Sequence, residues 1–155
     1  MPQHFRRIAA FTTFAVVVSG SVLQVAQPVQ AKSDGSDIVI NEVYTRGGSA
    51  NQPYKNKFVE IYNPTDRAID LTGVKLEYSA ETKTAASQSC SLAGSISAKG
   101  YFLVQLNSNA DNGVDLPKID QSCEGVRPSG TTGALALTRN GADVDVRSEE
   151  HTSEL

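Results

Sequence analysis

The sequence predicts an all-β fold, an antiparallel β-sandwich built as one domain. Two neighbouring segments, 58–62 and 74–78, alternate apolar with polar side chains at the period of two that a half-buried strand requires. Short candidate strands are separated by turns rich in Gly, Asn and Pro, and no segment after Ala31 has a helical period. A sheet with one wet face buries its other face against a second layer, which makes a sandwich the expected architecture.

The first half of the domain contains three expected strands. Residues 37–44 are rich in Ile and Val, as a first strand should be. Residues 58–62 place Val59 and Ile61 on one face, and residues 74–78 alternate apolar with charged side chains. Turn-forming Asn, Pro, Asp and Gly residues lie between the second and the third of these strands.

The second half contains two clear strands and two less certain ones. Residues 80–91 are rich in Thr, Ser and Ala, so they form either a polar edge strand or an irregular segment. Residues 101–106 are the strongest candidate for a central strand, and residues 134–138 form another. The pair Asn140-Gly141 predicts a two-residue hairpin that leads into a last strand at 143–146, which we expect to be cut short.

Residues 1–31 have the features of a secretory signal peptide. Arg6 and Arg7 precede an uncharged stretch, 8–29, and the segment closes on Val29-Gln30-Ala31, so we expect cleavage between Ala31 and Lys32. The competing interpretation is a membrane span. Polar and small residues interrupt the stretch and leave too short an apolar run to cross roughly 30 Å of hydrocarbon. We therefore expect general export, a secreted or cell-surface protein, and no transmembrane anchor after cleavage.

The C-terminal residues 147–155 abruptly replace a strand-like pattern with a polar, acidic one. In one reading frame they match the translated start of a widely used short-read sequencing adapter, which predicts a non-native tail. The alternatives are an ordinary solvated tail and a metal site that uses Glu149, Glu150 and His151. The expected organisation is then a polar lead at 32–36 and an incomplete sandwich at 37–146, with its last strand region missing.

Composition limits the classes of partner. Residues 32–146 number 115, a common size for one domain, and contain 11 Lys and Arg against 14 Asp and Glu. The two signs are interspersed, so a basic patch for nucleic acid is not expected. The nearest approach to a basic cluster is Arg46, Lys55 and Lys57, which we expect to be a solvated rim.

The two cysteines, Cys90 and Cys123, are predicted to form a disulfide, since export delivers the chain to an oxidising compartment. A catalytic or metal-binding thiol lacks partners because the two histidines, His4 and His151, lie in the signal segment and in the tail. The open alternative is that a cysteine beyond Val146 is the true partner of one of them.

Two polar loops are candidate binding segments. The first, 45–56, is long enough to be a binding loop, although a solvated connection is the plainer interpretation. The second, 107–117, holds carboxylates that suggest calcium but lacks the ligand spacing of an EF-hand loop, so we expect a surface turn and no cofactor. Calcium or glycan binding by these loops remains a weaker hypothesis. The candidate interaction residues of the first loop are Arg46, Gly47, Gly48, Asn51 and Tyr54.

Taken together, these segments resemble a bacterial secreted lamin tail domain, with a match from about Asp37 to Val146. The resemblance implies an immunoglobulin-like sandwich. It is carried by residues 38–44, the Gly-rich loop after them, and residues 58–63, 71–76, 100–105 and 133–138. For the recurrent motif residues Glu42, Glu60 and Asn63, we expect edge or turn hydrogen bonding rather than a functional site.

The resemblance also implies a non-catalytic module that contacts protein, cell-envelope or matrix surfaces through its loops. The residues themselves show no nucleophile with an adjacent base and no acidic cluster with metal spacing. The alternative function is an accessory domain of a larger exported hydrolase, such as a nuclease, whose catalytic part lies beyond Val146. The uninterrupted gene distinguishes the two, since only the hydrolase requires a downstream domain with His, Asp and Asn motifs.

Overall fold

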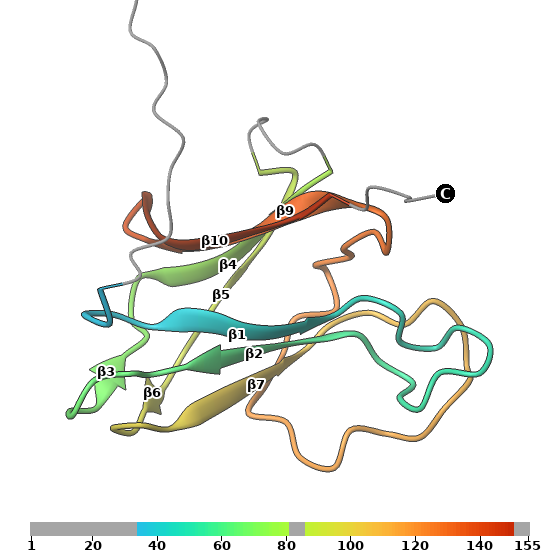
Figure 1. Ribbon diagram of the computed structural model, residues 1–155, viewed down its shortest axis with the longest axis horizontal. Helices are drawn as coiled ribbons and strands as arrows, with labels where there is room; N and C mark the ends of the chain where they lie inside the picture. The colour runs from blue at the N-terminus through green and yellow to red at the C-terminus, as the bar shows by residue number, and fades with distance from the viewer. Residues whose placement is uncertain (1–33, 81–85, 151–155) are drawn as a thin grey trace, which may run out of the picture.

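The computed structural model describes residues 34–80 and 86–150, and these residues form β-strands without any helix (Figure 1). The expected signal peptide, its cleavage point at Ala31 and Lys32, and residues 151–155 lie outside the described part. The strands are β1 (Val39–Tyr44), β2 (Phe58–Tyr62), β3 (Ile69–Asp70), β4 (Val74–Ser79), β5 (Gln88–Ser91), β6 (Ser95–Ile96), β7 (Tyr101–Gln105), β8 (Gln121–Ser122), β9 (Thr132–Arg139) and β10 (Ala142–Glu150).

The strands form two stacked sheets, as the sequence predicts. One sheet has the order β1-β2-β7-β8 and the other has the order β10-β9-β4-β5. Figure 1 shows the two layers one above the other, with the small β3-β6 ribbon at the end opposite the long loops. All pairings are antiparallel except that of β7 with β8. An all-β, immunoglobulin-like sandwich is therefore confirmed.

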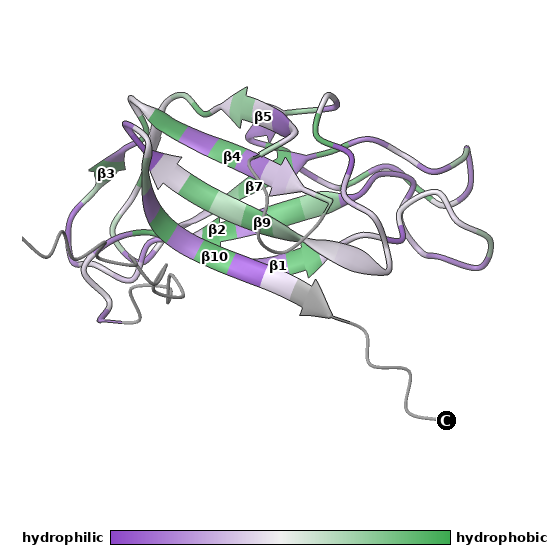
Figure 2. Cartoon of the chain, turned by 90° about the horizontal axis from the view of Figure 1, so that it is seen from above, coloured by the Kyte–Doolittle hydropathy of each residue, from purple (hydrophilic) through white to green (hydrophobic). Residues whose placement is uncertain are grey.

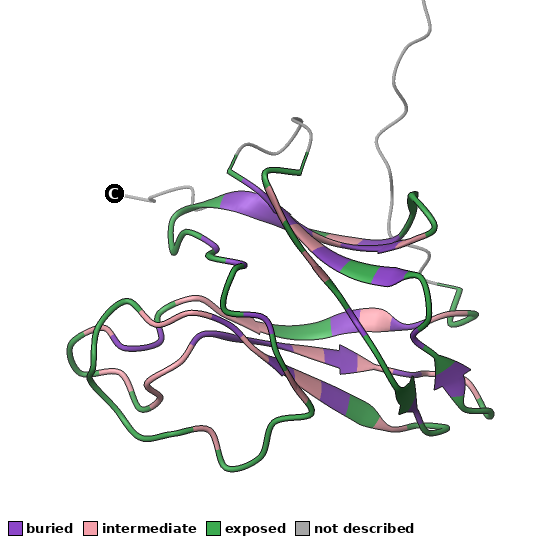
Figure 3. Ribbon diagram, turned by 180° about the vertical axis from the view of Figure 1, so that it is seen from behind, coloured by how far each residue is buried: buried purple, intermediate pink, exposed green. Residues whose placement is uncertain are grey.

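Apolar side chains from alternate strand positions fill the space between the sheets. The alternation along β4 and β10 is visible in Figure 2, and Figure 3 shows buried residues alternating with less buried ones along the strands of both layers. The core has no solvent contact at several positions because both layers contribute branched side chains that interdigitate. Fully buried members include Ile40, Val59, Ile61, Leu76, Val104 and Leu137.

The predicted hairpin between β9 and β10 is present. Asn140 and Gly141 both have positive φ angles, 52° and 82°, and Ala142 pairs with Arg139 across the turn. Two consecutive residues with positive φ define the tight turn whose twist suits a hairpin, and Asn and Gly tolerate that conformation best.

The last two strands extend further than the sequence pattern indicates. β10 ends at Glu150 rather than at Val146, because β9 begins at Thr132 and offers main-chain partners along the whole extension. Main-chain hydrogen bonds form with any residue except proline, so the polar character of residues 147–150 does not end the strand. The expectation of a strand cut short at Val146 is wrong, whereas the adapter origin of residues 147–155 stays a prediction.

The segment with an ambiguous pattern, 80–91, contains a short edge strand. Within its described residues, β5 pairs with β4 from Gln88 to Ser91 and carries Cys90. Three two-residue strands, β3, β6 and β8, have no signal in the sequence, because two residues are too few to show alternation.

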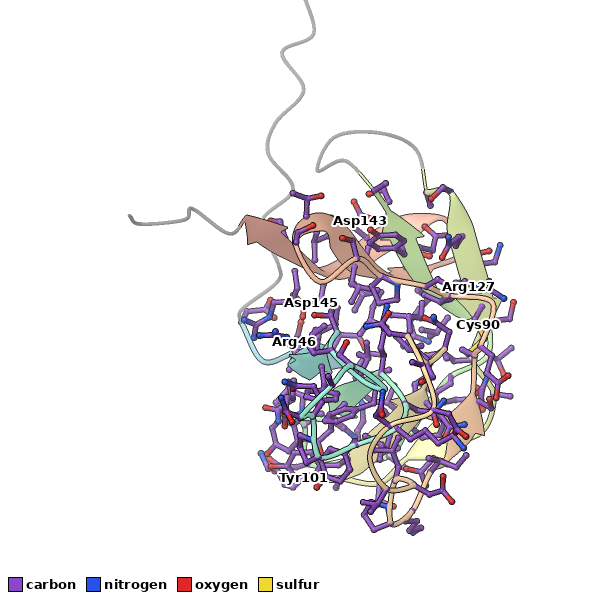
Figure 4. The ribbon with its side chains drawn as sticks, turned by 90° about the vertical axis from the view of Figure 1, so that its right-hand side faces the viewer. Arg46, Cys90, Tyr101, Arg127, Asp143 and Asp145 are labelled. Carbon is purple, nitrogen blue, oxygen red and sulfur yellow. A yellow bond between two sulfur atoms is a disulfide. The ribbon has the colours of Figure 1, made fainter. Side chains whose placement is uncertain are left out.

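The sandwich is closed at both edges by links between its sheets. On one side Cys90 of β5 forms a disulfide with Cys123, which follows β8, with a Cα–Cα distance of 5.9 Å. On the other side Asp145 of β10 accepts a hydrogen bond from the main-chain N–H of Ile40 at 2.7 Å, and Arg147 donates one to the Ile40 carbonyl at 3.1 Å. Figure 4 shows Cys90 and Asp145 on opposite sides of the molecule. The predicted pairing of the two cysteines is confirmed.

Candidate interaction surface

The predicted interaction loop connects β1 to β2 and lies at one end of the sandwich, on the right in Figure 1. Arg46 and Asn51 are exposed, Tyr54 is half-buried, and Gly47 and Gly48 are buried. The candidate residues therefore divide into two groups. Arg46, Asn51 and Tyr54 offer side chains to a partner, and the two glycines shape the loop.

Two glycines are required by close backbone approaches. A Cβ atom at Gly47 would lie 2.1 Å from the carbonyl carbon of Asn56, and one at Gly48 would lie 2.1 Å from the carbonyl oxygen of Ala110. Gly48 also has a φ of +77°, which side chains disfavour. The Gly-Gly pair thus lets the loop approach its own last residues near Asn56 and a second loop near Ala110.

That second loop is the polar segment after β7, and no pattern in either loop predicts that the two lie side by side. Gly48 forms an isolated bridge with Asn112, and Tyr54 forms one with Val114. The main-chain N–H of Lys55 donates to the Val114 carbonyl at 2.8 Å, and the Val114 N–H donates to the Pro53 carbonyl at 2.9 Å. The two segments therefore form one hydrogen-bonded unit, which we call the loop pair, residues 45–57 and 107–117.

Charge reinforces the loop pair at its surface. The Lys55 ammonium lies 2.5 Å from a carboxylate oxygen of Asp111, and both side chains are exposed. This hydrogen-bonded ion pair raises the pKa of Lys55 and lowers the pKa of Asp111, with the direct hydrogen bond as the main cause and charge attraction as the second. Within residues 34–80 and 86–150, no three His, Cys, Asp or Glu side chains are grouped to hold a metal ion.

Three aromatic rings join the loop pair to the sheet beneath it. Tyr44 and Phe58 stack with ring centroids 5.2 Å apart, and Tyr54 contacts both edge-on at 5.9 and 6.1 Å. Both geometries are favourable for aromatic pairs. The hydroxyl of Tyr44 also donates to Gln52 at 3.1 Å, so the loop is anchored by side chains as well as by main chain.

Lys57 corrects the expectation of a solvated basic rim. Its side chain is 4% exposed, and its Nζ donates to the carbonyl of Pro128 at 2.7 Å. Burial lowers its pKa, because the charged amine loses hydration. Arg46 is exposed and Lys55 is half-buried with its ammonium at the surface, so the three cations do not form one patch.

Replacing Lys57 with Met is expected to remove a pH dependence of stability. Between the lowered pKa in the folded chain and the ordinary value of 10.5, the unfolded chain binds more protons, so wild-type stability rises with pH there. Urea unfolding at a series of pH values up to 10.5 should therefore show that the stability of the wild type, relative to that of Lys57→Met, rises with pH. Lys75→Met, which removes a lysine from an exposed strand position, is the matched control, and the same pH trend relative to both variants would contradict the role of the buried amine.

Of the recurrent motif residues, Asn63 has the structural role that we expected. Its side chain is fully buried, donates to the carbonyls of Arg67, Ile96 and Ser97, and accepts from the N–H and hydroxyl of Thr65. The bonds join the turn after β2 to the segment between β6 and β7.

The other two motif residues, Glu42 and Glu60, lie opposite each other on β1 and β2. Glu60 accepts a hydrogen bond from the amide of Asn41 at 2.7 Å. Edge hydrogen bonding therefore accounts for Glu60, while Glu42 projects from an exposed position.

The described residues also contain a shallow hollow between the layers near the loop pair. The space inside it is about 10 Å³, and its lining includes Val43, Tyr78 and Leu135. This is room for about one water molecule, far below the roughly 300–1,000 Å³ of sites for small molecules. The loop pair is therefore the better candidate for function. No helix in the described part is long and apolar enough to cross a membrane.

Comparison with known proteins agrees with this geometry. The family model described as Lamin Tail Domain matches residues 31–151, which is most of the chain. A search among curated proteins finds no match.

Proposed function

Because the chain belongs to the lamin tail domain family, we propose that it is an exported, non-catalytic interaction module that contacts a protein, cell-envelope or matrix surface through the loop pair. The family is one of immunoglobulin-like interaction domains, and such sandwiches commonly present binding residues on loops at one end. Export and the choice of binding surface are supported by features of this chain itself.

The observation that carries the proposal is the locking of two loops into one unit. Main-chain bridges, the Lys55–Asp111 ion pair and the three aromatic rings hold it. On this unit Val114 is 65% exposed, and Arg46 and Asn51 of the same unit are also exposed, so it offers an apolar side chain and two polar side chains to a partner. A preorganised loop loses less conformational entropy on binding, which favours recognition.

Export is supported by the N-terminal pattern and by the disulfide, since disulfides persist mainly in oxidising compartments. The full chain, expressed in a bacterial host, is expected to appear outside the cytoplasm with Lys32 as its first residue. N-terminal sequencing of the product tests this directly. An uncleaved chain retained in the cytoplasm would contradict it.

Replacing Val114 with Asp is expected to weaken binding to the cognate surface by at least tenfold, because a charge in the middle of an apolar contact must be desolvated. Co-sedimentation of the purified chain with cell-envelope and extracellular-matrix fractions measures the effect. Thr72→Asp, at an exposed turn at the opposite end of the sandwich, is the matched control and should bind as wild type does. Equal binding by both variants would contradict a role for the loop pair.

A further inference from the structure

A second surface, next to the loop pair, is the outer face of the β1-β2-β7 sheet. The strand register places three rows of side chains on it, each running across β1, β2 and β7, because directly paired residues project from the same face. The neighbouring strand positions, such as Val59 and Val104, belong to the core, so the rows point away from it. The rows are Tyr44, Phe58 and Gln105; Glu42, Glu60 and Leu103; and Val39, Tyr62 and Tyr101.

The two flanking rows are aromatic. At one end of the face Tyr44 stacks on Phe58, and at the other Tyr62 and Tyr101 lie with ring centroids 4.8 Å apart. Tyr101 is 57% exposed, and Figure 4 shows it at the lower margin of the molecule, away from the space between the sheets. Tyr44 and Tyr62 are half-buried, and Phe58 is buried beneath Tyr54, so the accessible ring surface is that of Tyr101 and the edges of Tyr44 and Tyr62. Aromatic side chains are enriched at protein contact surfaces.

The middle row holds two carboxylates directly opposite each other, Glu42 on β1 and Glu60 on β2. Like charges in this position repel and destabilise a sheet. The ion pairs found among the described residues are Lys55–Asp111, Lys99–Asp66 and Arg139–Asp37, so neither glutamate is neutralised by any of them. The amide of Asn41 satisfies one oxygen of Glu60 but brings no charge. The face is therefore complementary to a cation flanked by apolar groups.

We propose that this outer face binds an extended segment of another protein in which a Lys or Arg lies between two apolar residues, each two positions away. This inference rests on the proposed function as an interaction module and adds a surface and a partner class to it. Successive rows on the face are two residues apart along a strand, which is about 7 Å. Alternate side chains of an extended partner have the same spacing, so its cation meets Glu42 and Glu60 while its apolar residues meet the rings.

Two physical terms favour a cation at this position. The carboxylates attract it, and the neighbouring Tyr rings add a cation–π contribution when the cation lies within about 6 Å of a ring centre. Burying the rims of Tyr62 and Tyr101 under the partner's apolar residues removes further surface from water. An acidic or uncharged partner segment lacks the attraction to the carboxylates and the cation–π contact, and only the burial of apolar surface would favour its binding.

The test is a titration of the purified, isotopically labelled full chain with the peptide Ser-Leu-Thr-Lys-Thr-Leu-Ser, followed by amide NMR shifts. Saturable shifts are expected on β1, β2 and β7, and the double variant Glu42→Gln/Glu60→Gln should weaken binding at least tenfold. The same peptide with Glu in place of Lys should not bind. Tyr101→Ser, at an exposed position, supplies a second variant that is expected to weaken binding without affecting the fold.

The matched control is Glu77→Gln on β4, because it removes one carboxylate from the other sheet while Glu77 pairs with Ser89 and Ala136 rather than with another acid. It should leave peptide binding unchanged. Absence of saturable shifts, shifts confined to the loop pair, or an equal loss with Glu77→Gln each overturns the inference. The envelope experiment separates the two proposals. If Val114→Asp abolishes surface binding but the glutamate variants leave peptide binding intact, the loop function stands and this inference fails.

Discussion

Replacing Cys90 and Cys123 together with Ser is expected to lower the free energy of unfolding by about 3–4 kcal/mol. The disulfide joins residues 33 positions apart, and removing it restores conformational freedom to a long loop of the unfolded chain. It also joins β5 at the edge of one sheet to the segment after β8 at the edge of the other. Urea unfolding of the oxidised wild type and the double variant measures the difference.

A reducing agent provides the internal control for this prediction. Reduction should bring the wild type to the stability of the double variant and leave the variant unchanged. Ser is nearly isosteric with Cys, so packing around the half-buried Cys90 and the buried Cys123 is disturbed little. A loss below about 1 kcal/mol would show that hydrogen bonds and burial hold these two edges together without the covalent link.

Replacing Asn63 with Ala is expected to cost about 3 kcal/mol, the second-largest effect that we foresee. The amide nitrogen donates to three carbonyls, and one of these bonds, to Ile96 at 3.0 Å, lies fully inside the protein. Ala leaves these carbonyls without their donor, and an unsatisfied buried polar group costs about 1–3 kcal/mol. Chemical unfolding followed by far-ultraviolet circular dichroism measures the loss. Tryptophan fluorescence cannot be used because the chain contains no Trp.

Thr65→Val is the matched control for Asn63, because it removes one hydroxyl from the same turn and keeps the shape of the side chain. It breaks the bond between the Thr65 hydroxyl and the Asn63 oxygen at 2.8 Å but leaves all three amide donations in place. We expect a loss of about 1 kcal/mol. An equal loss for the two variants would contradict the central role of the Asn63 amide.

The sequence predicts those parts of the fold that depend on local pattern. Val59 and Ile61 are buried and Glu60 is not, as the two-residue period requires, and the Asn140-Gly141 turn forms where two positive φ angles are needed. The disulfide was predictable because the chain offers one pairing of its own two cysteines. Each of these inferences uses neighbouring residues or composition alone.

The parts that sequence reasoning missed depend on contacts between distant segments. Lys57 can be buried because its side-chain nitrogen donates a hydrogen bond to the carbonyl of Pro128, 71 positions away. The bridge between Gly48 and Asn112 joins segments 64 positions apart, and nothing in either loop identifies the other. The Gly47-Gly48 pair was the available signal, since adjacent glycines indicate a close backbone approach, although they do not say what approaches.

The hydrogen bonds to Ile40 have a consequence for self-association. β1 is an edge strand, and an open edge offers its main chain as a template on which another copy can stack, the first step toward fibrous aggregates. Asp145 occupies the N–H of Ile40 and Arg147 occupies its carbonyl, so both polar groups of that residue are already satisfied from within. The bulge between Ile40 and Glu42 further breaks the regular spacing that an incoming strand would need. The β1 edge is therefore blocked at Ile40 against the addition of another strand.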